Sequence, residues 1–295
     1  MKDYRSFIQE HFLILDSHTQ QPVPFILNPV QNKYYSMLLE DYPKMEGVRE
    51  IVLKARQEGI SSLVLALFTV DFLLSPYSIS ICISHRKDAT ELLFKKVRFY
   101  IDSFCEKMGY NKDTFLRTDN KGLLESNVNR AMFYVGTAGA KVGGRGGSAT
   151  NILYSEAAFY QSTGKITAEE IILATSQQVP QGKGMIFIES TGNSTDDFYY
   201  GEWERAKRKE SIYQPRFFSW QEFYSPEWMD KKKQEFPSEL SFKREYPADE
   251  AEAFVSAGSP YFDNLKLKKC WIKRRNRLER ENCLPMEDYS NLIKG

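Results

Sequence analysis

One short stretch, VLKARQEGISS at residues 52–62, carries residue types suited to binding phosphate. Apolar runs precede and follow it, as in a tight turn between a strand and a helix, where backbone N–H groups can point at an anion. Gly59 permits such a turn, and Ser61 and Ser62 place hydroxyl groups at the start of the helix, where one can bind Mg²⁺. The stretch therefore predicts a binding site for the phosphates of a nucleotide.

The stretch lacks the lysine that usually binds the β- and γ-phosphates. In the signature G-x-x-x-x-G-K-[ST], Ile60 occupies the lysine position and Lys54 occupies the position of the first glycine. Because such a loop wraps around the phosphates, the long side chains of Lys54 and Arg56 could reach the same oxygen atoms. The alternative is an ordinary charged turn between a strand and a helix.

A second stretch, NILYSEAAF, places Ser155 and Glu156 at the end of an apolar run. Nucleotide hydrolysis needs a carboxylate at the end of a neighbouring strand, to order Mg²⁺ or to polarise the attacking water. We therefore predict Glu156 as the general base. Ser155 replaces the usual aspartate, and its hydroxyl could hold a metal-bound water.

A third stretch, MIFIESTGN, ends in the small polar residues Ser190, Thr191 and Asn193, which are suited to sensing a γ-phosphate. Ligands bind at the carboxyl ends of the strands in a parallel sheet. Three candidate stretches in this order, each at the end of a strand, support one another. An ordinary turn after a strand remains the alternative for the third.

Strands alternate with helices along the chain and would position these residues. The apolar runs predict strands at 49–54, 77–84, 130–138, 151–160 (with a turn) and 184–191, and helices at 61–74, 86–110 and 167–179. Residues 1–47 predict two helices joined by a proline-containing loop, and Ser61 or Ser62 is the expected N-cap of the third helix. This order predicts a mainly parallel sheet with helices on both faces and right-handed crossovers.

Composition limits the remaining possibilities. The formal net charge of the 295-residue chain is +1, so contact with nucleic acid must come from a local patch. Four cysteines without a C-x-x-C pair and three scattered histidines predict neither a disulfide framework nor a histidine metal cluster. No apolar run is long enough to span a membrane, and the charged N-terminus does not resemble a signal peptide, so we expect a soluble intracellular protein.

The order of LNPVQ, KARQEGISS, GRGGSATNILYSEAAF and ESTGN resembles the ATPase domain of the large terminase subunit of tailed bacteriophages. The later PSELSFKREYPADEAEAFVSAGSPYF adds to the resemblance, which covers roughly residues 25–262. Many terminases carry the lysine at the front of the loop and Ser-Glu in place of Asp-Glu. The resemblance implies a P-loop NTPase fold of the ASCE type, with ATP as substrate and Mg²⁺ as cofactor.

The resemblance also implies roles for single residues. Gln31 would recognise adenine, although a surface glutamine at a helix start is the alternative. Arg145 would act as an arginine finger in a neighbouring subunit, the alternative being a surface loop, and Arg56 is a second candidate within its own subunit. Ser190, Thr191 and Asn193 would couple loss of the γ-phosphate to movement of DNA. The predicted nucleotide-binding residues are Gln31, Lys54, Arg56, Gln57, Gly59, Ser61 and Ser62, and the predicted Mg²⁺ residues are Ser61, Ser155 (through water) and Glu156.

The function implied is that of an ATP-hydrolysing motor domain that drives double-stranded DNA into a viral procapsid. Expected partners are the DNA, the portal protein and the small terminase subunit. The expected assembly is a homo-oligomeric ring, or a monomer in isolation, in the host cytoplasm and transiently at the portal, with no membrane. Residues 1–262 would form the ATPase domain, with a lid or edge subdomain at about 196–260, and 263–295 a basic hinge or linker without a nuclease domain.

Two other functions remain open at this point. A superfamily-2-like helicase would share the ATP site, but the sequence has no Asp-Glu-x-His box and no clear second lobe. A catalytically inactive scaffold that binds DNA or the portal would fit Ser155 and the displaced lysine. The basic segment at 266–280 could contact DNA phosphates, or could be a solvated helix face or a linker.

Overall fold

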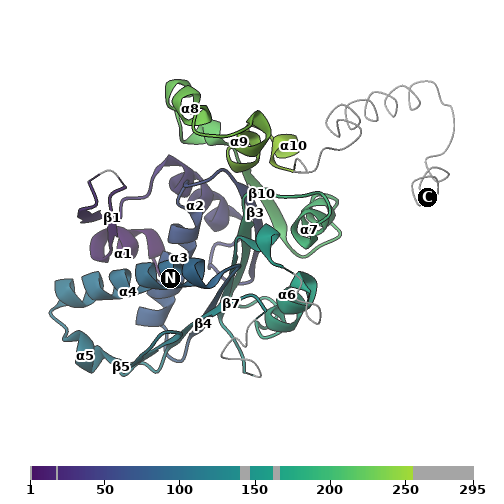
Figure 1. Cartoon of the computed structure of the whole chain (residues 1–295). Helices are drawn as coiled ribbons and strands as arrows, with labels where there is room; N and C mark the ends of the chain where they lie inside the picture. The colour runs from purple at the N-terminus through teal and green to yellow at the C-terminus, as the bar shows by residue number, and fades with distance from the viewer. Residues whose placement is uncertain (1, 18, 140–146, 162–166, 255–295) are drawn as a thin grey trace, which may run out of the picture.

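The computed structural model describes residues 2–17, 19–139, 147–161 and 167–254. Its centre is an eight-stranded sheet in the order β10-β3-β9-β8-β4-β7-β6-β5 (Figure 1). Six strands are parallel, namely β3 (Val48–Lys54), β4 (Ile79–Ser84), β7 (Met132–Thr137), β8 (Asn151–Ser155), β9 (Met185–Ser190) and β10 (Gln214–Phe218). The short strands β5 (Leu116–Asp119) and β6 (Leu123–Ser126) extend one edge antiparallel. The predicted α/β fold with a mainly parallel sheet is confirmed.

Helices cover both faces of the sheet (Figure 1). One face carries α1 (Tyr4–His11), α2 (Pro29–Asp41), α3 (Ile60–Leu74) and α4 (Lys87–Met108), with the single-turn α5 (Lys112–Phe115) after them. The other face carries α6 (Ala168–Ser176) and α7 (Phe198–Lys207). The parallel strands read as apolar runs because both of their faces are buried, and β3 has no exposed residue.

Alternation along the strands divides the core into two parts. Val52, Leu153 and Phe187 pack on the side of α3, whereas Leu53 and Ile188 pack on the side of α6 and α7. Since side chains alternate with a period of two, the residue two places after each of the first three also points toward α3. This rule decides which residues meet at the ends of β3, β8 and β9.

Three local features differ from the sequence predictions. The expected loop between the first two helices contains a small hairpin of β1 (Leu13–Leu15) and β2 (Pro22–Pro24). The pair β5–β6 was not predicted. The N-cap of α3 is Gly59, with no side-chain cap, and not Ser61 or Ser62 as expected. Both serines lie in the first turn and bond to other parts of the protein, which explains why neither caps the helix.

The aromatic and charged segment after β9 divides into two parts. Its first part, α7 and β10, belongs to the main sheet, because β10 pairs with β3. Its second part holds η2 (Trp220–Glu222), α8 (Pro226–Lys233), α9 (Glu239–Glu245) and α10 (Glu250–Ala253), which lie beside the ends of β3 and β10 in Figure 1. We call residues 219–254 the helical cap. The predicted basic hinge lies outside the described residues.

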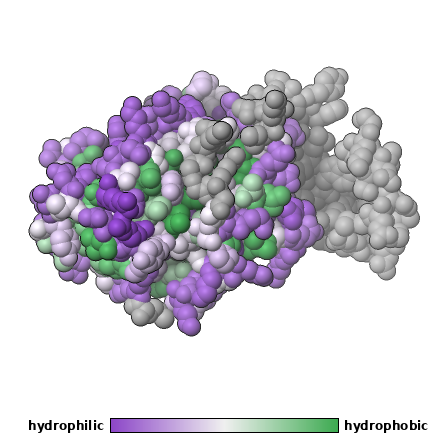
Figure 2. Space-filling view, turned by 90° about the horizontal axis from the view of Figure 1, so that it is seen from below, coloured by the Kyte–Doolittle hydropathy of each residue, from purple (hydrophilic) through white to green (hydrophobic). Residues whose placement is uncertain are grey.

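The described surface is mixed in character. On the face drawn in Figure 2, hydrophilic residues surround smaller groups of apolar ones. Exposed apolar side chains such as Tyr77, Val128 and Ile212 come from separate parts of the chain. Within the described ranges, no helix has both the length and the apolar character needed to cross a membrane.

Candidate active site

The ends of β3, β8 and β9 bring three predicted or polar residues to one place. Strand pairing sets Ser155 directly opposite Glu189, and Val52 of β3 opposite Glu189 from the other side. Lys54, Ser155 and Glu189 each follow by two residues a core residue that packs on the side of α3. Their side chains therefore meet beneath the start of α3, at the carboxyl edge of the parallel strands.

Glu189 is the centre of this group. Its side chain is 0% exposed, and its Oε1 accepts hydrogen bonds from Ser155 Oγ at 2.6 Å and Ser61 Oγ at 2.8 Å. Its Oε2 lies 3.1 Å from Lys54 Nζ in an ion pair. A buried carboxylate is costly unless it is paired and hydrogen-bonded, and here its partners are three residues of the predicted site.

Lys54 links the two carboxylates of the site. Its Nζ lies 3.1 Å from Glu156 Oε1 as well as 3.1 Å from Glu189, and its side chain is only 5% exposed. Burial alone would lower the pKa of Lys54, but Glu156 and Glu189 outweigh it and hold that pKa above its ordinary value. The lysine is therefore a permanent cation at the start of the loop, as the sequence predicts for a displaced phosphate-binding lysine.

Glu156 sits just past β8 in an unusual backbone conformation. Its φ of 55° and ψ of 47° place it in the left-handed region, which is uncommon for a residue with a side chain. Its Oε2 accepts hydrogen bonds from Ser190 Oγ at 3.4 Å and Thr191 N at 3.3 Å. The side chain keeps 27% exposure, so the carboxylate is held in place but remains open to a water or a substrate.

The third predicted stretch divides its contacts between Glu156 and the turn that follows it. Ser190 Oγ also accepts a hydrogen bond from Ala158 N at 3.2 Å. Asn193 Nδ2 donates to the carbonyl oxygen of Ala158 at 3.1 Å. The end of β9 is therefore bonded to the predicted base and to the 3-10 turn η1 (Ala157–Phe159), an arrangement in which a change at one is felt at the other.

The loop between β3 and α3 is shaped by Gly59 and by the start of α2. Gly59 has a φ of 82°, where glycine is favoured. Gln31 Nε2 donates to the carbonyl oxygen of Gly59 at 2.8 Å, and Asn28 Nδ2 donates to that of Glu58 at 3.0 Å. Asn28 and Gln31 also form the capping box of α2. Gln31 thus contacts the loop, and its role in binding adenine stays a prediction.

Glu58 is a carboxyl group that the sequence reading did not single out. It is fully buried, and neither carboxyl oxygen has a hydrogen-bond partner among the described residues. Burial raises the pKa of Glu58 to about 9, with Glu222 adding to the increase while Lys54 and Lys33 oppose it. The group is therefore neutral at neutral pH, in the middle of the loop.

The two serines at the start of α3 have different partners. Ser61 points to Glu189, whereas Ser62 Oγ accepts a hydrogen bond from Lys96 Nζ of α4 at 2.8 Å. The Lys96 side chain is exposed as a whole, but protein atoms crowd its amine. This crowding lowers the pKa of Lys96, while Glu189 raises it and Lys54 lowers it further. A second cation therefore lies at the start of α3.

The outer side of the loop is bound to the helical cap. Arg56 N donates to the carbonyl oxygen of Glu245 at 2.8 Å, and Arg56 Nη1 forms an ion pair with the Glu245 carboxylate at 3.2 Å. Tyr224 donates its hydroxyl proton to the carbonyl oxygen of Arg56 at 3.0 Å. Gln57 is exposed, with a φ of 63°. Arg145, the predicted finger, lies outside the described residues.

Glu189 and Lys96 are the site residues that sequence reasoning missed. Glu189 had a signal, because it is the only charged residue in the apolar run MIFIES. Its significance depends on β8 and β9 being neighbours in the sheet, which the sequence does not state. Lys96 is one of several lysines on the long helix α4, and only the packing of α4 against α3 selects it.

The described residues contain no group of three or more His, Cys, Asp or Glu side chains arranged to hold a metal ion by themselves. Mg²⁺ with a nucleotide needs less, because phosphates and waters supply most of its ligands. Two hydroxyls, Ser61 and Ser155, together with the carboxylates of Glu189 and Glu156, provide oxygen atoms of the kind that Mg²⁺ prefers. The residues present therefore fit a nucleotide-bound Mg²⁺.

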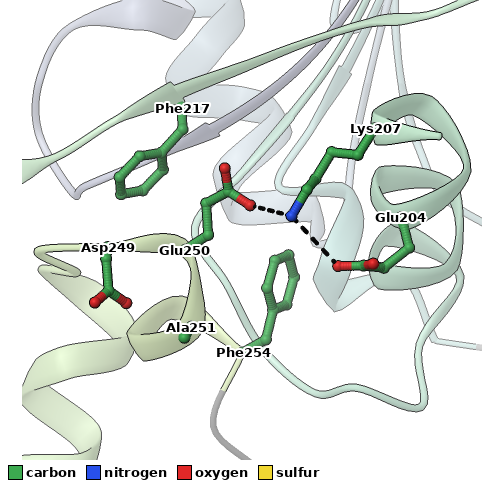
Figure 3. A pocket seen from close by; sticks show the side chains of 7 residues that line it. All are labelled: Glu204, Lys207, Phe217, Asp249, Glu250, Ala251 and Phe254. Atoms are coloured by element: carbon green, nitrogen blue, oxygen red, sulfur yellow. Dashed lines mark hydrogen bonds and ion pairs between the residues drawn. The ribbon is translucent and has the colours of Figure 1, made fainter. Parts of the chain in front are cut away.

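A separate hollow of about 360 Å³ lies between α7, β10 and α10. Figure 3 shows the Lys207 amine between two carboxylates, 2.6 Å from Glu250 and 3.7 Å from Glu204. Its lining consists of Glu204, Lys207, Phe217, Asp249, Glu250, Ala251 and Phe254. None of the predicted site residues lines it, and its ion pairs connect the end of the helical cap to the main domain.

No protein-family model matches the sequence, and neither does any curated protein. Solved structures do match. The large terminase ATPase domain of Thermus phage P74-26 has a TM-score of 0.53 at 18% identity, over 76% of this chain and 99% of that one. The large terminase of bacteriophage HK97 has a TM-score of 0.59 at 13% identity, over 83% of this chain and 53% of that one. The chain has the fold of a large terminase ATPase domain.

A third terminase adds a nucleotide complex. This large terminase, from another thermophilic bacteriophage and in complex with ADP, has a TM-score of 0.51 at 9% identity, over 69% of this chain and 48% of that one. We call it the ADP-bound terminase. The chain thus spans nearly all of the P74-26 domain and about half the length of the HK97 terminase and the ADP-bound terminase. The fold class, a P-loop NTPase, agrees with the sequence prediction.

Proposed function

We infer that the chain is the ATP-hydrolysing motor domain of a viral DNA-packaging terminase. The observation that carries this proposal is the contact of Lys54 with Glu156 and Glu189 at the carboxyl edge of the sheet, beside the loop that opens α3. The terminase ATPase fold supports it, as does the nucleotide in the ADP-bound terminase. ATP is the substrate, and Mg²⁺ bound to its phosphates would be held near Ser61 and Ser155.

Lys54 binds the terminal phosphates in place of the usual lysine. Its ammonium group is shared between two carboxylates, so an incoming triphosphate competes for it. When Lys54 turns toward the phosphates, Glu156 loses one partner and keeps the Ser190 and Thr191 contacts. Glu156 is then free to accept a proton from the attacking water, as a general base must. Substrate binding therefore activates the base.

Lys96 supplies a second positive charge for the phosphates. Its amine already bonds to Ser62 at the start of α3, where the helix dipole and free backbone N–H groups attract an anion. Bound magnesium offsets part of the phosphate charge, and Lys54 and Lys96 supply protein cations from opposite sides of the loop. This second lysine compensates further for Ile60 at the position where phosphate-binding loops usually carry lysine.

The partners of the motor are proposed from the same terminase reading. Arg145 would enter a neighbour's site and stabilise charge on the transferring phosphoryl group, which requires a closed ring with a heterologous interface. The ring would act on double-stranded DNA at the portal, together with the small terminase subunit. Loss of the γ-phosphate would be sensed through Ser190, Thr191 and Asn193.

Steady-state ATP hydrolysis with Mg²⁺, measured across a wide range of protein concentration, tests this proposal. We expect specific activity to rise with concentration, and Glu156→Ala and Arg145→Ala each to abolish it. Glu169→Ala, at an exposed site on α6, is the matched control and should behave like the wild type. Wild-type protein without turnover at any concentration would refute an independent motor and favour a scaffold. Unwinding stimulated by single-stranded DNA would instead favour a helicase.

A further inference from the structure

Ser155 stands where nucleotide hydrolases of this kind carry a carboxylate, so the site needs a negative charge from another position. Glu189 lies directly opposite Ser155 on the adjacent parallel strand. The two side chains point to the same face and bond to each other, with Ser155 Oγ donating to Glu189 Oε1 at 2.6 Å. A carboxylate on β9 therefore occupies nearly the same space as one on residue 155 of β8 would.

The direction of the hydrogen bonds shows what this carboxylate can do. A serine hydroxyl has one proton and two lone pairs, whereas a carboxylate only accepts. Ser61 and Ser155 both give their protons to Glu189 Oε1, at 2.8 and 2.6 Å. The lone pairs of both hydroxyls are therefore directed away from Glu189 and stay available to a cation or to water held by one. The ion pair of Glu189 with Lys54 orients the phosphate-binding lysine in the same way.

We propose that Glu189 replaces the carboxylate missing at residue 155, and that it orients Ser61 and Ser155 toward the magnesium ion of bound nucleotide while holding Lys54 in place. Glu189 is thus a positioning residue that acts through three others. This inference rests on the proposed function. It differs from a purely structural role, in which Glu189 would only neutralise the buried Lys54.

The test compares ADP affinity with Mg²⁺ and with EDTA, using calorimetry, which needs no turnover. The ratio of the two affinities is the magnesium enhancement. Residues that orient metal ligands typically change metal affinity by roughly 10- to 100-fold. We expect Glu189→Gln to reduce the enhancement at least about tenfold. Adding Ser155→Asp to Glu189→Gln should restore most of it, because the carboxylate returns to β8.

Glu50→Gln is the matched control. Glu50 is also a fully buried strand carboxylate, on β3, and it pairs with Arg216 away from the site at 3.0 Å. Its replacement should leave the enhancement unchanged although it too removes a buried charge. If Glu189→Gln does not fold, Glu189→Asp keeps the charge and withdraws it by one methylene from both serines. The enhancement should then fall by an intermediate amount.

Three outcomes would overturn the inference. A full enhancement in Glu189→Gln, or in Glu189→Asp where that variant must be used, would leave Glu189 only a structural role. A loss that Ser155→Asp does not restore would show that Glu189 does not replace the residue-155 carboxylate. Wild-type protein that binds no ADP with or without Mg²⁺ would overturn both this inference and the proposed function, whereas the first two outcomes leave the function standing.

Discussion

Gln31 Nε2 donates a hydrogen bond to the carbonyl oxygen of Gly59 at 2.8 Å, and the same nitrogen lies 2.6 Å from where a Cβ on residue 59 would be. The start of α2 and the turn before α3 thus fit together only because residue 59 has no side chain. A glutamine predicted to bind adenine also fixes the shape of the loop that would bind the phosphates.

Replacing Gly59 with alanine should therefore weaken the loop for two reasons. The φ of 82° is unfavourable for alanine by roughly 1–2 kcal/mol, and the new methyl group would displace Gln31 and break its bond to the loop. We expect a lower free energy of unfolding in urea and weaker ADP binding. Gly109→Ala is the control, because its φ is 70° but no atom lies within 4 Å of the added Cβ. Equal losses in both variants would refute the role of Gln31.

Replacing Lys54 with methionine should destabilise the protein even without nucleotide. The change leaves the fully buried Glu189 without its cation, and breaking such a pair costs about 3–5 kcal/mol. Adding Glu189→Gln removes the unpaired charge and should recover a large part of that loss. Urea unfolding of the two single variants and the double variant gives the coupling energy. Additive losses would show that the two side chains do not interact in solution.

Replacing Lys96 with methionine should weaken nucleotide binding while leaving the fold intact. The amine is exposed enough to lose without leaving a buried charge, and a charge-assisted bond to phosphate is typically worth about 1.5–3 kcal/mol. ADP affinity, measured by calorimetry, should fall about tenfold or more. Lys95→Met changes the net charge equally at the preceding exposed position and is expected to bind as the wild type does. Matching affinities for both variants would remove Lys96 from the site.

Glu58 should make stability depend on pH. Its pKa is raised from 4.5 to about 9, so the folded protein keeps a proton there that the unfolded chain releases. Its contribution is full below about pH 4.5 and is lost as pH rises through about 9, by at most about 1.4 kcal/mol per unit. Glu50, raised to about 7, acts in the same direction at lower pH, so pH 7–9 isolates Glu58.

Urea unfolding at pH 7, 8 and 9 tests this expectation. Glu58→Gln should lose less stability across this range than the wild type does. Glu106→Gln, at an exposed position on α4, should follow the wild-type slope. Parallel slopes for wild type and Glu58→Gln would mean that Glu58 is ionised in the folded state, stabilised by Lys54 or Lys33 more than its burial allows.

The sequence predicts those parts of the site that follow from one strand or one turn. Ser155 and Glu156 end an apolar run, and Gly59 and Ser61 open a helix, so local patterns suffice to place them. The contact between Ser155 and Glu189 is different, because it requires β8 and β9 to be neighbours in register, although 34 residues separate the two side chains. Lys96 likewise depends on how two helices pack.

The same reasoning explains the errors in the fold. The hairpin β1–β2 includes Pro22 and Pro24, residues that usually argue against a strand, and it is tolerated because only two strands pair there. Serine is a common N-cap, which favoured Ser61 and Ser62. The tertiary partners Glu189 and Lys96 take up both hydroxyls instead, and Gly59 ends the turn.

The attachment of the loop to the helical cap has a mechanical consequence. Arg56 bonds to Glu245 at the end of α9, and Lys243 of α9 forms an ion pair with Glu252 of α10 at 3.1 Å. Two short steps therefore connect the loop with the point where the described chain ends at residue 254. A pull on the chain at that point would load the loop directly, and a loop reshaped by its ligand would pull back along the same line.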